Sequence, residues 1–109
     1  MISEDDVSRA LDWLVKSAAP AAKARADVAW IEEYRKSKKA LLMRQSEAKT
    51  AVIAEAEAYS HPEYLELLEG YKEAVRVDTE FRWLQASAMA RIDAWRTLNA
   101  NYRIQAKIG

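Results

Sequence analysis

Apolar residues recur every three or four positions along most of the chain, which is the spacing of one face of an α-helix. The first such run is Val7, Leu11, Leu14 and Ala18. Ser3 stands just before this run, with Asp6 three positions on, as at a helix N-terminus. Pro20 disfavours the helical conformation in the residue before it. The pattern therefore predicts a first helix over residues 4–18.

A second periodic run extends over residues 21–58 and contains neither proline nor glycine. Because the segment holds no strong helix breaker, we expect one long helix here. Its predicted apolar face is Trp30, Tyr34, Leu41, Ala48, Val52, Ala56 and Tyr59. Four further apolar residues lie off this face: Val28, Ile31, Leu42 and Met43.

The sequence from Ser60 to Glu63 interrupts the periodicity and is typical of a helix start, with Ser60 as the cap and Glu63 completing a capping box. His61 then has a turn or capping role. A third helix is predicted over residues 62–106, with Gly70 where another backbone approaches or the helix bends. Its apolar face is Tyr64, Leu67, Tyr71, Ala74, Val77, Phe81, Leu84, Ala88, Ile92, Trp95, Leu98 and Tyr102. Outside that face are Leu65, Leu68, Val75, Trp83 and Met89.

The short connection at Ser60 and His61 predicts that the two long helices fold back on each other. Residue 35 would then lie near residue 87, and the first helix would cross the open end. The predicted fold is one all-α domain over residues 1–109, a long antiparallel helical hairpin. A lone hairpin would leave the additional apolar residues exposed, so we expect a homodimer that forms a four-helix bundle. The candidate interface residues are Leu42, Trp83 and Met89.

The composition agrees with long helices, because the 109 residues include only two glycines and two prolines. The chain has no cysteine, which excludes disulfides and Cys-ligated zinc. No stretch approaches the ~20 uncharged apolar residues of a membrane span. The acidic residues at the start do not resemble a signal peptide. These features predict a cytoplasmic protein with no membrane partner.

Charge is unevenly distributed although the chain is neutral overall. Residues 51–73 hold six Glu and one Lys, a net charge of −5, whereas residues 13–50 hold nine Lys or Arg and four acidic residues, a net charge of +5. Charges of this kind keep a helical rod soluble and help its helices to pair. An alternative is a rod that joins two differently charged partners or stacks head to tail.

The densest basic run predicts a patch for nucleic acid or for a protein partner. It comprises Arg35, Lys36, Lys38, Lys39 and Arg44, and the expected hairpin register adds Arg82. Cations can neutralise phosphates while nearby aromatic rings stack on unpaired bases. The alternative is that the aromatic residues are core or interface side chains and the cations extend beside them.

No combination of residues typical of an active site occurs in the sequence. The lone histidine, His61, is not part of a zinc-protease motif, and the Ser and Thr residues have no His–Asp partner set. There is also no glycine-rich phosphate loop. We therefore expect no enzyme activity, no cofactor and no bound metal.

Several segments of the chain resemble small helical-hairpin proteins encoded by tailed phages and prophages. They are residues 34–43, His61–Tyr64, Leu67–Gly70, Arg82–Trp83 and Ile92–Thr97. The resemblance spans about residues 30–100 and implies a phage accessory factor, of a family without assigned function, from the replication and recombination region. It also implies that the protein is located in the cytoplasm of the host cell.

The leading hypothesis is a non-enzymatic accessory protein that binds and modulates a protein machine of DNA metabolism or host defence. A single-stranded nucleic-acid accessory binder that uses the basic patch is the first alternative. A structural scaffold or adaptor of the virion is the second.

Overall fold

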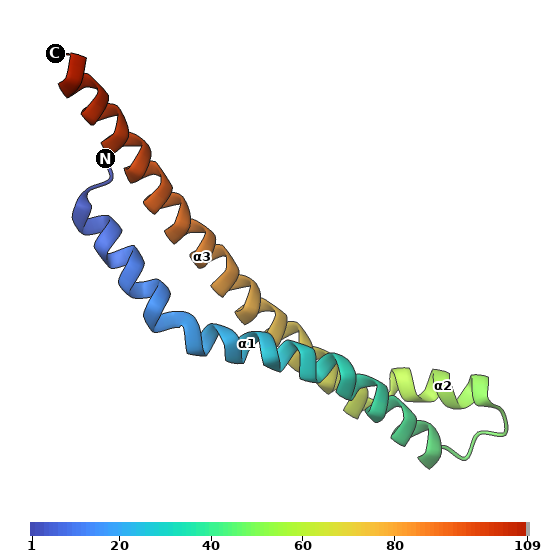
Figure 1. Cartoon of the computed structure of the whole chain (residues 1–109). Helices are drawn as coiled ribbons and strands as arrows, with labels where there is room; N and C mark the ends of the chain where they lie inside the picture. The colour runs from blue at the N-terminus through green and yellow to red at the C-terminus, as the bar shows by residue number, and fades with distance from the viewer. Residues whose placement is uncertain (109) are drawn as a thin grey trace. The chain divides into compact units, whose positions relative to one another are not determined.

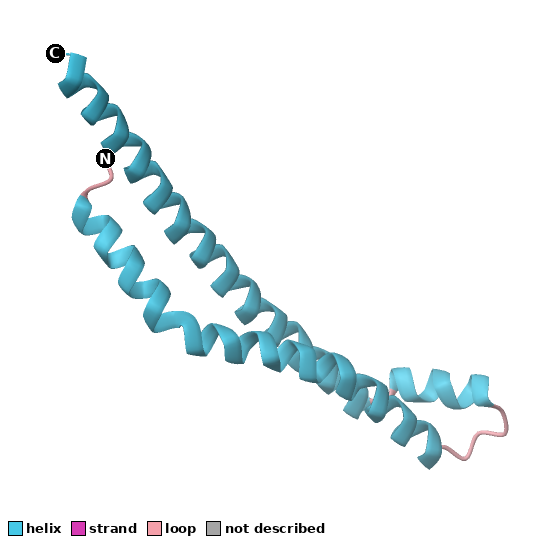
Figure 2. Ribbon diagram, in the orientation of Figure 1, coloured by secondary structure: helices cyan, strands magenta, loops and turns pink. Residues whose placement is uncertain are grey.

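The computed structural model describes residues 1–108 and is built of three α-helices (Figures 1 and 2). They are α1 (Glu4–Gln45), α2 (Ala51–Ser60) and α3 (Pro62–Ile108). The prediction of an all-α fold is confirmed, since no β-strand occurs within residues 1–108.

The chain divides into two compact units, where the sequence predicts one domain. Unit 1 comprises Met1–Ala21 and Thr79–Gly109, and unit 2 comprises Ala22–Asp78. Helices α1 and α3 are each divided between the two units, whereas α2 belongs to unit 2 alone. The single long hairpin and the dimer stay predictions.

The start of α1 is held by the predicted cap. The Ser3 amide donates to Asp6 Oδ2 at 2.9 Å, and the Asp6 amide donates to Ser3 Oγ at 3.2 Å. Arg9 Nη2 also donates to Asp6 Oδ1 at 2.6 Å. The Ser3 amide, followed by Arg9, lowers the pKa of Asp6 from 3.8 to about 2. The first turn therefore depends on an ionised Asp6.

Helix α1 continues through Pro20, so the predicted end at residue 18 is wrong. An internal proline removes one backbone hydrogen bond and costs roughly 3 kcal/mol. Alanines on both sides of Pro20 favour the helix. Packing on either side adds to this, because Ala10 in unit 1 and Val28 in unit 2 are both buried.

The predicted helix over residues 21–58 is two helices, α1 and α2, separated by residues 46–50 (Figure 2). Side-chain oxygens at the break accept backbone donors: Ala48 donates to Ser46 Oγ at 3.0 Å and Ile53 to Thr50 Oγ1 at 3.2 Å. The Ser46 hydroxyl also donates to the Glu57 carboxylate. Ser and Thr compete with helical hydrogen bonds in this way, which explains a break without glycine or proline.

Helix α3 begins at Pro62, as predicted, but His61 rather than Ser60 stands at the junction. The His61 amide donates to the Ala58 carbonyl at 3.2 Å, and its Nδ1 accepts the Glu63 amide at 3.1 Å. The Ser60 hydroxyl instead donates to the Ala56 carbonyl. His61 thus ends α2 and caps α3.

In unit 1, the N-terminal part of α1 packs antiparallel against α3 (Figure 1). The buried cluster is Val7, Ala10, Ala88 and Ile92, covered by Ile2, Trp13, Leu14 and Trp95. Ala88 and Ile92 belong to the predicted apolar face of α3, and both are buried. The predicted face of the first helix is rotated, because Leu11 is exposed and Ala10 is buried instead.

In unit 2, α1 contacts both α2 and the first part of α3. The buried cluster is Leu42, Ala58 and Tyr64, covered by Met43 and Leu68. Leu42, predicted at the dimer interface, is only 5% exposed and belongs to this core, since the break lets α2 fold back over it.

The residues paired across unit 2 also differ from the predicted register. Lys38 is paired with Glu63, Arg25 with Asp78, and the Arg35 guanidinium lies over the Tyr71 ring. Residue 35 therefore lies near residue 71 rather than 87. The reason is that the connection back to α3 includes all of α2.

Gly70 lies in the interior of α3, and apart from its own helical neighbourhood no atom lies within 4 Å of the place where a Cβ would stand. Of the two alternatives predicted for Gly70, the close backbone approach is therefore wrong. We predict that Gly70→Ala raises the free energy of unfolding by about 0.5–1 kcal/mol, because alanine is the better helix former. Denaturant unfolding measures this. The control Ala86→Gly, on an exposed position of α3, should lower it by a similar amount, and an unchanged Gly70→Ala midpoint would contradict the prediction.

The cap of α1 predicts an acid transition at the N-terminus. The folded pKa of Asp6 lies below its ordinary 3.8, so its stabilising effect is complete above pH 3.8 and is lost as the pH falls towards 2. The protection of the Ser3 amide and of the first-turn amides, taken relative to the intrinsic exchange rate at each pH, should fall over this range. In Asp6→Asn this pH dependence should be absent. Equal protection at pH 5 and pH 2 in the unaltered chain would argue against the cap.

Candidate interaction surfaces on α1

The basic run of α1 lies in unit 2 and faces the acidic residues that follow it in the chain. Lys38 Nζ is 3.0 Å from Glu63 Oε2, and Lys39 Nζ is 3.4 Å from Glu55 Oε2. Both lysine side chains are partly buried. The Lys38 contact lowers the pKa of Glu63. These two lysines therefore hold α1 to α2 and α3.

Aromatic rings contact two cations of the run, and one of them is the already paired Lys39. Lys39 Nζ lies 4.7 Å from the centroid of the Tyr59 ring, and Arg35 Cζ lies 4.9 Å from that of Tyr71. Tyr59, and after it Glu55, raise the pKa of Lys39. The Tyr71 hydroxyl donates to Glu32 Oε1 at 2.8 Å, which raises the pKa of Tyr71. Lys39 thus stays charged and Tyr71 stays protonated.

The remaining predicted cations differ in their surroundings. Lys36 pairs with Glu33 at 3.1 Å on the exposed side of α1. Arg44 lies in the last turn of α1, where a positive charge favours the helix terminus. Arg82 belongs to unit 1, and the residues that contact the basic run are Tyr59, Glu63 and Tyr71 instead. Its inclusion in the patch followed from the wrong register.

A groove of about 490 Å³ borders the basic run. It is lined by Arg35, Lys36, Lys39, Ala40, Met43, Tyr59 and Tyr64. Three of the lining residues are cations and none is acidic. Tyr59 and Tyr64 meet edge to face at 5.4 Å, so the groove combines positive charge with aromatic surface.

An aromatic and aliphatic stripe lies on another face of α1, where Trp30 and Leu41 are exposed and Tyr34 is half-buried. Trp30 and Tyr34 stack with ring centroids 4.8 Å apart and planes 11° from parallel. Leu41 follows seven residues after Tyr34, on the same face of the helix. Trp30 is 63% exposed and Leu41 is 46% exposed. We call Trp30, Tyr34 and Leu41 the α1 stripe.

The predicted apolar face of this segment includes Trp30, Tyr34 and Leu41, but Trp30 and Leu41 are exposed and Tyr34 is only half-buried, so this part of the prediction is wrong. Ala24, Val28 and Leu42 repeat at helical spacing on a different face and are buried. Aliphatic residues at helical spacing, without aromatic rings among them, were the available signal, because such a face permits closer helix packing than a face of bulky rings.

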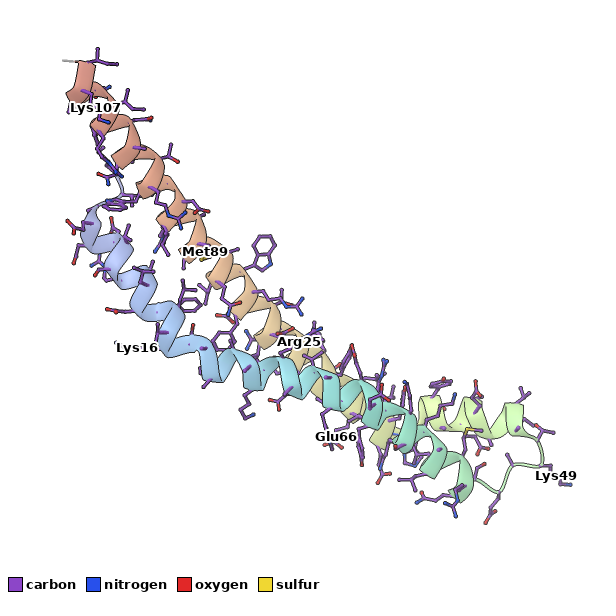
Figure 3. The ribbon with its side chains drawn as sticks, in the orientation of Figure 1. Lys16, Arg25, Lys49, Glu66, Met89 and Lys107 are labelled. Carbon is purple, nitrogen blue, oxygen red and sulfur yellow. The ribbon has the colours of Figure 1, made fainter. Side chains whose placement is uncertain are left out.

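Two further observations concern the described residues. Within residues 1–108, no helix is long and apolar enough to cross a membrane. No group of three or more His, Cys, Asp or Glu that could hold a metal ion occurs among these described residues. Lys49 projects from the loop between α1 and α2 (Figure 3).

Comparison of the chain with protein-family models, with curated proteins and with solved structures gives no match.

Proposed function

We propose that the protein is a non-enzymatic interaction protein that docks on a protein machine through the α1 stripe and modulates it. The observation that carries this proposal is a stacked Trp30–Tyr34 pair in line with Leu41, in which Trp30 and Leu41 are exposed and Tyr34 is half-buried. Aromatic residues of this kind dominate the energetics of protein interfaces. The resemblance to phage helical-hairpin proteins supports an accessory factor of DNA metabolism or host defence.

The make-up of the α1 stripe favours a protein over a charged polymer as its partner. Lys23 and Asp27 continue the same face towards the N-terminus, and they neutralise each other at 2.8 Å. Burying a Trp or Leu side chain stabilises a complex by roughly 1.5–3 kcal/mol. A helix with this spacing of apolar side chains suits a hydrophobic groove on the partner.

The test is a binding assay with variants of the α1 stripe. The tagged chain should retain a defined set of proteins from the host lysate. Trp30→Ala/Leu41→Ala should weaken the affinity for the retained protein by about a hundredfold or more, because two large side chains lose their burial. The control Val52→Ala/Leu65→Ala removes other exposed apolar side chains of unit 2 and should bind normally.

Equal retention by the stripe variant and the control would contradict the proposal. So would a wild-type chain that retains nothing beyond the tag alone. Circular dichroism of both variants separates lost binding from lost folding.

The groove beside the basic run favours a second candidate, an accessory binder of single-stranded nucleic acid. Arg35, Lys36 and Lys39 line it beside the Tyr59 ring, and phosphates with stacked bases need such a combination. The engagement of Lys39 by Glu55 and Tyr59 makes this the weaker candidate.

Fluorescence anisotropy with an unstructured oligonucleotide tests this second candidate. Lys38 and Lys39 hold the helices together, so the informative variant is Arg35→Gln/Lys36→Gln. It should weaken binding and lower the salt slope by about 1.4, or about 0.7 per lost cation. Lys16→Gln/Lys23→Gln, with the same change in net charge, is the control. Absence of binding by the wild-type chain at low salt would exclude the candidate.

We also propose that the protein acts as a homodimer. Trp83 and Met89, predicted as interface residues, are both exposed on the α3 segment of unit 1. They are six residues apart, which places them about 120° apart around the helix. A single partner helix therefore contacts only one of them. Leu42 is part of the core of unit 2 and is excluded from this interface.

A further inference from the structure

One face of α3 in unit 1 carries an acidic residue, an apolar residue, a small residue and a basic residue in order. These are Glu80, Leu84, Ser87 and Arg91. At 100° per residue they lie within an arc of about 60° on the helix. Leu84 is 46% exposed. The face is therefore accessible and has its charges at opposite ends.

A groove of about 460 Å³ runs along this face, between α3 and the start of α1 in unit 1. From α3 it is lined by Leu84, Ser87, Ala88 and Arg91, and from α1 by Asp6, Arg9, Ala10 and Trp13. Asp6 and Arg9 pair with each other. Within residues 1–108, the Arg91 side chain has no hydrogen bond and no ion pair.

We propose that two copies of the chain pair along this face of α3, antiparallel about a two-fold axis between Gln85 and Ala86. This inference rests on the proposed homodimer and assigns its surface and register. The axis sets Glu80 of each copy opposite Arg91 of the other, and Leu84 opposite Ser87. A two-fold axis repeats each contact, so two ion pairs enclose two Leu–Ser contacts.

Charge order selects the antiparallel arrangement. A parallel pairing in register would place Glu80 against Glu80 and Arg91 against Arg91, and like charges across an interface are strongly unfavourable. In the antiparallel register the otherwise unpaired Arg91 meets a carboxylate. The occupant that complements this face is therefore the same face of a second copy.

The neighbouring side chains suit this register. Ser87 is small, which permits two helices to approach within the usual distance of about 8–10 Å. Trp83, which is 73% exposed, borders the face. The register brings its indole beside Arg91 of the second copy, where a cation–π contact forms. Met89 lies about 170° around α3 from the centre of the face and takes no part.

Charge reversal tests the register, with dimerisation measured by analytical ultracentrifugation. The wild-type chain should sediment at twice its 12.4 kDa mass at micromolar concentration. Glu80→Arg alone, or Arg91→Glu alone, should weaken dimerisation about tenfold or more, because each creates two like-charge contacts. An equimolar mixture of these two variants should restore a heterodimer, since every contact then joins opposite charges.

Matched controls distinguish this face from the rest of α3. Arg96→Glu changes the net charge as Arg91→Glu does, but Arg96 contacts Asp93 away from the face and should leave the dimer intact. Leu84→Asp should dissociate the dimer, whereas Met89→Asp, at a residue of nearly equal exposure, should not. Circular dichroism confirms that each variant is folded.

Two outcomes would overturn the inference in different ways. A wild-type chain that stays at 12.4 kDa would remove both the homodimer and its register. A dimer that neither charge reversal weakens, or two weakened variants that fail to form a heterodimer, would remove the register alone. Neither outcome bears on the docking of a partner protein at the α1 stripe of unit 2.

Discussion

Close helix packing through small side chains is the constraint on which the rest of this structure depends. Ala10 and Ala88 are buried in unit 1, and Ala24, Ala54 and Ala58 are buried in unit 2. Helices that meet through alanine lie close together and leave no room for indole rings between them. Bulky side chains are therefore displaced to the margins or outward, as Trp30 and Trp83 are. Docking surfaces follow directly from the way the helices pack.

Electrostatics complements this packing within unit 2. The acidic segment after the break folds back on the basic run, where Lys38 meets Glu63 and Lys39 meets Glu55. Each exposed pair contributes little by itself. Together they favour the folded-back arrangement over a continuous helix, in which these partners would lie far apart. The same pairing removes cations from the surface on which nucleic acid would bind, which is why the neutral α1 stripe carries the proposed function.

The two proposed surfaces belong to different units and differ in character. The α1 stripe of unit 2 is aromatic and uncharged, which suits an apolar groove on another protein. The α3 face of unit 1 has opposite charges at its ends, which suits a second copy in reverse orientation (Met89 marks the same helix in Figure 3). A dimer formed through unit 1 would carry two α1 stripes, so binding to a partner with repeated sites would gain from multivalency.

Local signals in the sequence determined the helical class, the cap formed by Ser3 and Asp6, and the start of α3 at Pro62, because each depends on neighbouring residues alone. The continuation of α1 through Pro20 and the break at Ser46–Thr50 were not predictable in this way. Pro20 is tolerated because alanines and packed segments flank it, and the break between Ser46 and Thr50 forms where folding back buries residues such as Leu42. The tertiary structure also decided which face of α1 is buried, since apolar residues occur on more than one face of this helix. Which face is buried depends on the shape and charge of the opposing helix, and the fold-back at the break sets that pairing.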